Sequence, residues 1–507
     1  MRHAPKRWGL WAIGAAAIGL WALRVLPELG PGPPDGLYNS DSAIPVLMSN
    51  LATGAPLDWL YWGQDRFGAW PFLLARVLAL PFDAAWTPHR LHVLHAMIWI
   101  SALYPWARLA GRGAILASLA FLLLPGMNPI LRRTLVDVGH VDAWQLSSLL
   151  WAWWGLRCAA EAPRPAVPLA GAALAAVLAT TVSFVSVPLL LVLALVEGIR
   201  VGAPWRRRAW LLLPLVGGVC AESLIRHRWH VFVLAQKWRD VRTPASLDVG
   251  HLGENLFGIF RTAAENQALP WLGAALVVGA LVAWQLRPGE REPSDGWTAV
   301  GAALCVAAVL ALLVAVRHVR DNAYAARYLG VPLVFAILGI GVVADSAARR
   351  LLRRLAAPAT EVILAVGALA ALAVALPAAR PDPLEELLRP VAAALASGHP
   401  GAVLVDSYWR TYAVAALAPP RALVPLPAEG EWNRRPDWVP LLASGRPVLF
   451  GNTGPLAQEG PAPPPERTQY GTRLWLVRPD VQVVAPSPLE GAGPDRLSLY
   501  APRPPPR

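Results

Sequence analysis

The chain has 507 residues, of which 55% are hydrophobic and only 15% are charged. Soluble proteins carry roughly 25% charged residues, so this composition excludes an ordinary soluble domain and indicates a chain that crosses a membrane many times. The net charge of +12 does not indicate nucleic-acid binding, because many basic residues gather at the ends of apolar stretches that alternation assigns to one side of the membrane.

Eleven apolar stretches are predicted to span the membrane as helices, since about 20 apolar residues cross the hydrocarbon core with every backbone amide satisfied internally. Within the long apolar stretch 166–202, Thr180, Thr181 and Ser183 predict a tight hairpin between two of these helices. The spans cover roughly 8–26, 89–109, 114–131, 143–158, 166–181, 184–200, 209–225, 270–287, 297–316, 327–346 and 359–377.

The basic clusters set the predicted topology. "RRR" at 206–208 and "RRLLRR" at 349–354 follow the positive-inside rule, which places the N-terminus in the cytoplasm and everything after residue 377 outside. The spans are nearly free of ionisable residues in this reading. We therefore expect an α-helical polytopic membrane domain over 1–377 and a small α/β domain outside the membrane over 378–507, with a disordered end.

The first outer segment, 27–88, is predicted to hold two short helices. "SDSAIPVLMSNLATG" has Ser40, Asp41 or Ser42 as the helix N-cap, with Gly54 as its terminator. "WPFLLARVLALPF" at 70–82 is too short to span a membrane and fits a helix lying in the interface. A second large outer loop covers 226–269.

The outer domain is predicted from a change in pattern after residue 400. "GAVLVDSYWRTYAVAAL" predicts a buried strand at 402–405, a turn at 406–407 and then a helix. The segments "RALVPL", "PVLF" and "TRLWLV" predict further strands between turns rich in proline and glycine.

Asp41 is the first candidate for chemistry. Its carboxylate can cap the helix by accepting a backbone N–H, or it can act as a general base on a substrate whose headgroup lies at the membrane surface. The two roles are compatible, and the sequence does not separate them.

Other polar residues fall on the same predicted side as Asp41. Arginine suits a phosphate because its planar fork donates two hydrogen bonds while keeping its charge. A structural explanation is also open for two of these places: Gln64 can belong to a solvated turn, and Arg327 can snorkel to the interface. Candidate substrate-binding residues are Gln64, Arg66, Arg132, Asp137, His140, Arg320, Arg327 and Tyr328.

Three signatures are missing from the sequence. It contains no GxGxxG, no P-loop and no HExxH. This argues against a nucleotide-sugar enzyme of Rossmann type.

The order of these segments resembles the C-type glycosyltransferases (GT-C), which include protein O-mannosyltransferases and lipid A aminoarabinose transferases. "NSDSAIPVLM" and "WPFLLARVLALPF" stand where that family has an acidic residue and an interfacial helix in the first outer loop. "RRTLVDVGHVD" stands where the family has a short outer turn with Arg and Asp between two spans. "ARYLGVPLVF" stands where an Arg-Tyr pair opens a late span, and "VDSYWRTY" stands in the outer α/β tail.

The resemblance implies inverting transfer of a sugar from a polyprenyl-phosphate-linked donor to a glycan, lipid or protein acceptor on the outer face of a bacterial cytoplasmic membrane. It implies that Asp41 is the base that deprotonates the acceptor, or that it positions the donor. It also implies that Arg327 holds the lipid phosphate, helped by Arg320 or Arg317. Asp137 and His140 would line the sugar pocket. Ser42 stands where many members have glutamate; no cofactor is identified, and a divalent metal ion is left open.

Two other functions stay open on the sequence. A transporter or flippase for a lipid-linked glycan would need polar residues deep within the spans. A non-catalytic, membrane-anchored glycan-binding protein would keep its function in the isolated outer domain.

Overall fold

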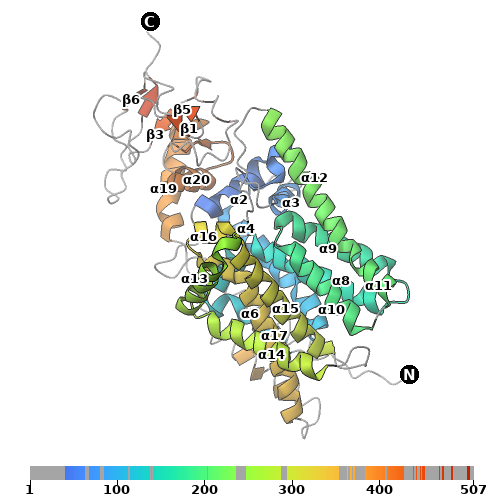
Figure 1. Ribbon diagram of the computed structural model, residues 1–507. Coiled ribbons are helices and arrows are strands. Elements are labelled where there is room, and N and C mark those ends of the chain that lie inside the picture. The colour runs from blue at the N-terminus through green and yellow to red at the C-terminus, as the bar shows by residue number, and fades with distance from the viewer. Residues whose placement is uncertain are drawn as a thin grey trace. The chain divides into compact units, whose positions relative to one another are not determined.

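The computed structural model describes the chain as two compact units (Figure 1). The first holds the described parts of Val93–Ile225 and Thr243–Ala379, and the second those of Glu28–His92, Arg226–Arg242 and Arg380–Arg507. The described residues are 40–62, 68–79, 85–111, 115–137, 139, 141–202, 204–235, 247–286, 294–352, 362–363, 366–367, 369–370, 383–405, 408–427, 438, 441, 446, 448–450, 467–468, 471–472, 481–483 and 500–502.

The first unit is helical. Its centre is α17, which packs against α15, α6 and α14, while α8 packs against α9 and α10. The helices with most of their residues in this unit are α4 (Pro88–Ser101), α5 (Leu103–Leu109), α6 (Ile115–Met127), α7 (Pro129–Val136), α8 (Asp142–Glu161), α9 (Ala166–Val182), α10 (Ser186–Arg200), α11 (Trp205–Leu211), α12 (Leu213–Ala235), η3 (Val249–His251), α13 (Leu252–Glu265), α14 (Leu269–Gln285), α15 (Ser294–Ala315), α16 (Arg317–Asp321), η4 (Ala326–Leu329) and α17 (Gly330–Leu351).

Small residues let these helices approach closely. A Cβ on Gly279 of α14 would lie only 2.3 Å from the Cβ of Ala303 on α15, so no larger side chain fits there without a shift. Close contacts through glycine and alanine are typical of helices packed within a bilayer, where apolar burial alone gives no drive to associate. The packing therefore fits the expected polytopic membrane protein.

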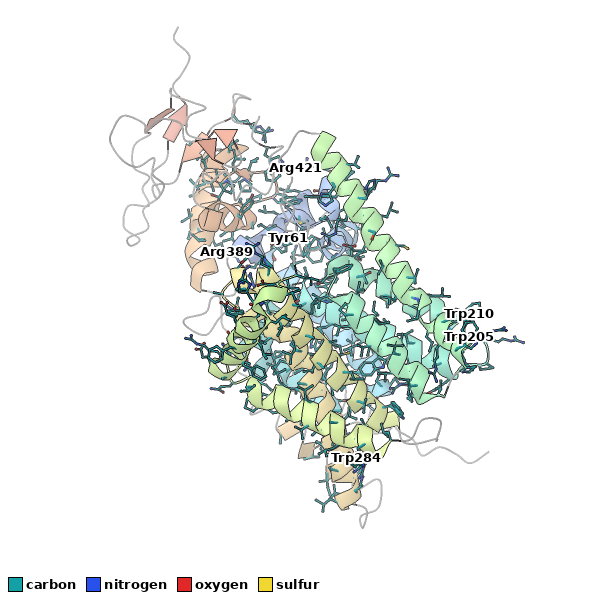
Figure 2. The ribbon with its side chains drawn as sticks, viewed as in Figure 1. Tyr61, Trp205, Trp210, Trp284, Arg389 and Arg421 are labelled. Atoms are coloured by element: carbon teal, nitrogen blue, oxygen red, sulfur yellow. The ribbon has the colours of Figure 1, made fainter. Side chains whose placement is uncertain are left out.

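Tryptophans mark the ends of several apolar helices. Trp205 and Trp210 project from α11, and Trp284 projects from the last turn of α14 with 90% of its surface exposed (Figure 2). Indole rings prefer the boundary between lipid and water because the ring is apolar and its N–H is polar. Their places suit the ends of membrane-spanning helices.

Three described helical segments are long and apolar enough to cross a membrane, namely Trp205–Val231, Gly296–Ala315 and Ala326–Leu351, or up to five if each of two bent pairs counts as one span. The expected count of eleven stays a prediction, since the first and most of the last expected span lie outside the described residues. The hairpin expected near Ser183 is confirmed, because α9 ends at Val182 and α10 begins at Ser186.

Two helix pairs in the first unit are bent. The chain turns by 102° between α6 and α7 and by 110° between α13 and α14. "LRRTLV" is therefore a helix and no simple outer turn, because Asn128 accepts a hydrogen bond from the amide of Ile130 and Pro129 opens α7. Likewise, much of the second outer loop is helical.

The second unit contains α2 (Ser40–Leu51), η1 (Pro56–Trp59) and α3 (Trp70–Ala79), which confirm the two short helices expected in the first outer segment. Asp58 holds the turn after α2 by accepting hydrogen bonds from the amide and hydroxyl of Thr53 and from the indole of Trp62. Helix α2 packs against α20 (Tyr408–Leu417) in the same unit.

The strand and helix expected after residue 400 are present as β1 (Ala402–Val405) and α20. Strands β2 (Leu423–Pro425) and β3 (Val448–Phe450) pair with β1 in parallel, in the order β2-β1-β3, with Val403 opposite both Val424 and Val448. Helix α19 (Pro383–Gly398) packs on α20. The short pairs are β4 (Arg467–Thr468) with β5 (Gly471–Thr472) and β6 (Val481–Val483) with β7 (Tyr500–Pro502). Most of the expected strand "TRLWLV" lies outside the described residues.

Candidate functional site

The segment between α15 and α17 carries three of the predicted binding residues. Helix α16 ends in a Schellman motif, in which the amide of Tyr324 donates to the carbonyl of Val319 and the amide of Ala323 donates to that of Arg320. Ala323 and Tyr324 have φ angles of 50° and 54°, a left-handed conformation that glycine normally supplies. This reversal leads the chain into η4 and places Arg327 and Tyr328 directly before α17.

Asp248 ties this segment to α13. One of its carboxylate oxygens lies 2.6 Å from Nδ1 of His251, and the other lies 2.8 Å from the guanidinium of Arg320. Asn255 donates to that second oxygen at 3.3 Å and to the carbonyl of Val314 at 2.9 Å. The three contacts come from three places in the chain, so Asp248 fixes their mutual positions.

Tyr324 belongs to the same cluster of side chains as Asp248 and Asn255. Its hydroxyl donates to the side-chain oxygen of Asn255 at 3.1 Å, and a Cβ on Gly258 of α13 would lie 2.4 Å from its ring. Burial and the nearby carboxylate of Glu254 raise the pKa of Tyr324, with Arg320 acting in the opposite direction. The phenol therefore stays protonated and keeps donating to Asn255.

The electrostatics of Asp248 follow from these partners. Burial acts to raise the pKa of Asp248, but the hydrogen bonds from His251 and Asn255 and the charge of Arg320 outweigh it, so the pKa lies below its ordinary value. Asp248 is therefore ionised at neutral pH. Sequence reasoning missed this residue, because nothing in "SLDVGH" indicates a partner as distant as Arg320.

Arg327 and Tyr328 present polar groups at the head of α17. The guanidinium of Arg327 is exposed and lies 5.3 Å from the centre of the Tyr328 ring. It donates a long hydrogen bond, 3.4 Å, to the side-chain oxygen of Asn322. The ring of Tyr328 also meets His318 edge-on, at 6.2 Å between centroids. The hydroxyl of Tyr328 is buried, and no residue in the described part of the chain hydrogen-bonds to it.

Helix α7 brings a second group of predicted residues to η4, since the two elements pack directly. A Cβ on Gly330 would lie 2.0 Å from the hydroxyl oxygen of Thr134, so only glycine lets α17 begin this close to α7. Asp137 is buried at the end of α7, where it accepts a hydrogen bond from the amide of Gly139 at 2.8 Å. Arg132 is half-buried on the same helix.

The structure therefore gathers Arg132, Asp137, Arg320, Arg327 and Tyr328 on elements that pack together. Arg320 is paired with Asp248, so it positions the segment that carries Arg327. Asp41 is the second residue of α2 and belongs to the second unit. Gln64, Arg66 and His140 lie outside the described residues. No group of three or more His, Cys, Asp or Glu side chains in the described ranges could hold a metal ion, and the divalent ion left open by the sequence stays untested.

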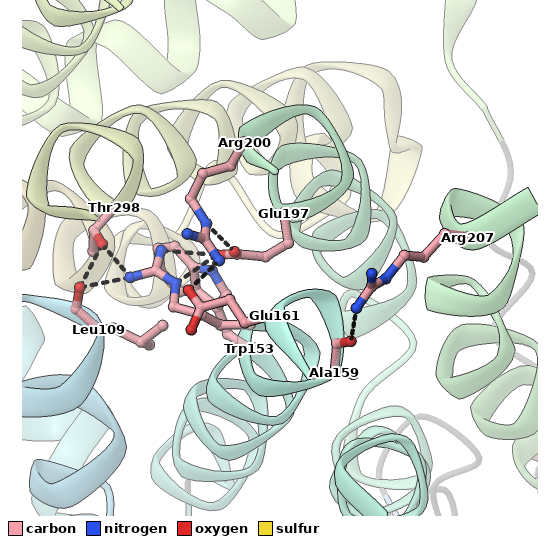
Figure 3. A network of polar contacts seen from close by, with 9 residues as sticks. Leu109, Trp153, Ala159, Glu161, Glu197, Arg200, Arg207 and Thr298 are labelled. Atoms are coloured by element: carbon pink, nitrogen blue, oxygen red, sulfur yellow. Dashed lines mark hydrogen bonds and ion pairs between the residues drawn. The ribbon is translucent and has the colours of Figure 1, made fainter. Parts of the chain in front are cut away.

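A second polar network was also missed. Arg157 of α8 donates to Glu197 of α10 at 2.7 Å, and Glu197 also accepts from Trp153 at 2.8 Å and from Arg200 at 2.6 Å (Figure 3). Arg157 and Thr298 of α15 both donate to the carbonyl of Leu109. With side chains 5% and 0% exposed, Arg157 and Glu197 form a buried ion pair.

This network corrects the expectation that the helices are nearly free of ionisable residues. Its polar atoms are satisfied by one another, and they join α5, α8, α10 and α15. A buried pair of this kind fixes which helices meet. The network therefore has a structural role.

The chain is similar to known proteins in its structure and not in its sequence. No family model and no curated protein sequence matches the chain. ArnT from Cupriavidus metallidurans in the apo state has a similar structure, with a TM-score of 0.53, 13% identity and 98% of each chain covered. ArnT from the same organism bound to undecaprenyl phosphate gives a TM-score of 0.51, 14% identity and 98% coverage of each chain.

A weaker likeness connects the chain with the archaeal oligosaccharyltransferase AglB from Archaeoglobus fulgidus. That structure gives a TM-score of 0.47 at 14% identity and covers 88% of this chain and 69% of that chain. The likeness to ArnT extends over almost the whole chain, so the chain shares the fold of ArnT. The mostly helical architecture expected from the sequence agrees with this likeness, and the expected helix count stays a prediction.

Proposed function

We propose that the chain is a membrane glycosyltransferase that moves a sugar from a polyprenyl-phosphate-linked donor to an acceptor on the outer face of a bacterial cytoplasmic membrane. The observation that carries the proposal is the exposed guanidinium of Arg327 at the head of an apolar helix, beside the buried hydroxyl of Tyr328, for which the described residues supply no hydrogen-bond partner. The similar ArnT structure bound to undecaprenyl phosphate supports a prenyl phosphate as the ligand.

The chemistry assigned to these groups is inverting transfer. An acceptor hydroxyl attacks the anomeric carbon, the bond from that carbon to the phosphate oxygen breaks, and polyprenyl phosphate leaves with the bonding electrons. Negative charge grows on the phosphate as the bond breaks, so a cation aimed there stabilises the transition state more than the ground state. Arg327 supplies that cation, and Tyr328 donates a hydrogen bond to a phosphate oxygen.

Asp41 is proposed to take the proton from the acceptor hydroxyl, opposite the leaving group. Asp41 is the second residue of α2 and so lies inside the first turn rather than at the N-cap expected from the sequence, where a carboxylate complements the positive end of the helix dipole. Asp137, His140, Arg132, Gln64 and Arg66 are proposed to bind the sugar and acceptor. Membrane lipids surround the helices, the N-terminus is cytoplasmic and the second unit is outside.

The Asp41→Asn variant tests the proposed role of Asp41 as a base. Asparagine has nearly the same size and shape as aspartate, yet it cannot act as the base because it carries no carboxylate. In membranes supplied with labelled polyprenyl-phosphate sugars, we expect label transfer to fall by about a hundredfold or more, while insertion and thermal stability stay unchanged. Undiminished transfer would remove Asp41 from the mechanism.

A further inference from the structure

The second unit contains an open pocket of about 480 Å³, away from every residue assigned above. It lies where the parallel strands begin: Gly401 precedes β1, Arg421 precedes β2 and Arg446 precedes β3. Thr53, held by Asp58 after the end of α2, forms another part of the wall. Ligand pockets commonly measure 300–1,000 Å³, so there is room for one or two sugar rings.

The described lining of the pocket carries charge of one sign. Arg421 and Arg446 are both exposed and line it, and no carboxylate belongs to its described lining. Arg446 makes one long contact, 3.5 Å from its Nη1 to the carbonyl of Gly401. Arg421 has neither an ion-pair nor a hydrogen-bond partner in the described part of the chain. Two guanidinium groups at one opening attract a phosphate or carboxylate.

The backbone around Arg421 is held in an unusual conformation. Arg421 has a φ of 65°, which is rare for a residue with a long side chain, and Gly401 has a φ of 77°. The amide of Ala422 donates to Pro419, and the amide of Gly401 donates to Ala422. Hydrogen bonds thus fix the turn that carries Arg421 at the pocket, and such left-handed positions often occur where a ligand is held.

The remaining wall is apolar and aromatic. Leu51 and Leu423 contribute aliphatic surface, and Trp438 contributes an indole whose ring meets Trp62 edge-on at 5.3 Å between centroids. An indole next to cations suits a sugar that carries an anionic group, because the C–H face of the ring packs on the indole while the anion reaches an arginine.

We propose that this pocket binds an anionic sugar, one that carries a phosphate or a carboxylate. This proposal rests on the function proposed above. The bound sugar is a part of the acceptor that lies away from the reacting hydroxyl. The acceptor is then an acidic glycan or glycolipid. Binding at this pocket needs neither Asp41 nor Arg327.

The test measures binding to the full-length protein purified in detergent, by titration calorimetry. Glucose 1-phosphate should bind saturably, inorganic phosphate more weakly and glucose not at all. Arg421→Ala and Arg446→Ala should each weaken binding of glucose 1-phosphate by about tenfold, because each removes charged hydrogen bonds. Arg261→Ala is the matched control, since Arg261 is an exposed arginine paired only with Glu265 in the described residues, and it should change nothing.

Two further arms complete the experiment. Asp41→Asn should bind glucose 1-phosphate as the native protein does, so a failure of catalysis and a failure of this pocket are distinguishable. Lipid-linked anions are tested with vesicles containing phosphatidylglycerol, whose binding should not depend on Arg421 or Arg446. Three results would overturn the proposal: binding of glucose 1-phosphate in both arginine variants as tight as in the native protein, no binding of glucose 1-phosphate by the native protein, or an effect of the arginine variants on vesicle binding alone.

Discussion

Asp248 joins three parts of the chain through single side-chain contacts, with His251, Asn255 and Arg320. The position of Arg327 depends on this carboxylate, because Arg320 lies one turn before the reversal that leads into η4. Residues outside the proposed phosphate contact thus decide where Arg327 lies. A substitution of Asp248 is expected to disturb the candidate site while leaving the helices around it in place.

The pH dependence of this cluster follows from the lowered pKa of Asp248. A carboxyl group with a lower pKa in the folded state stabilises that state above its ordinary pKa of about 3.9, and the contribution is lost as pH falls through the folded pKa. The protection of the α13 amides from hydrogen exchange, measured relative to their intrinsic exchange rates at each pH, should therefore fall below about pH 4. In Asp248→Asn this pH dependence should vanish. The same pH profile of hydrogen exchange in the native protein and in Asp248→Asn would refute the assignment of the effect to Asp248.

The bend between α6 and α7 is the element that brings Arg132 and Asp137 to η4. Asn128 holds it with two different groups: its oxygen accepts from the amide of Ile130, and its nitrogen donates to the carbonyl of Asn266 at 2.9 Å. The first contact caps α7, and the second connects the bend with the end of α13. Both bent pairs thus meet at one side chain.

Two variants at Asn128 separate these contacts. Asn128→Asp keeps an oxygen that caps the helix but loses the donor to Asn266, whereas Asn128→Ala loses both. Loss of an N-cap costs about 0.5–2 kcal/mol, so thermal unfolding should rank the native protein first, Asp next and Ala last. An alanine variant as stable as the native protein would show that the bend is held by packing alone.

The buried network of Arg157 and Glu197 sets the arrangement of four helices in the first unit. Glu197→Gln leaves the guanidinium of Arg157 buried without its counter-charge, and such a break costs about 3–5 kcal/mol. Glu161→Gln is the matched control, because Glu161 pairs with Arg200 at 2.7 Å but is 55% exposed, and exposed pairs contribute at most about 1 kcal/mol. Equal loss of thermal stability in both variants would contradict the structural role.

At the scale of the whole molecule, local patterns in the sequence predicted the elements well. The apolar runs, the caps and the proline and glycine turns located α2, α3, the hairpin at Ser183 and the order β1, α20, β2, β3. Each of these depends on neighbours in the chain. The α6–α7 bend was missed because "LLLPGMNPILRR" reads as one apolar run followed by a turn.

Contacts between distant residues were beyond the sequence. Asp248 with Arg320 and Arg157 with Glu197 join elements that only tertiary packing brings together. The position of Arg327 before α17 was predicted from "ARYLGVPLVF", but the cluster that holds it was not. The relation of Asp41 to Arg327 stays a prediction.

The most direct test of the central claim concerns Arg327. Purified protein in lipid vesicles would be supplied with a labelled polyprenyl-phosphate sugar, and the rate of transfer compared between the native protein, Arg327→Ala and the control Arg261→Ala. Removing a group that stabilises charge in the transition state lowers turnover by about 10²–10³-fold, so we predict that loss for Arg327→Ala and none for the control. Native turnover in Arg327→Ala would contradict the assignment of this arginine to the leaving phosphate.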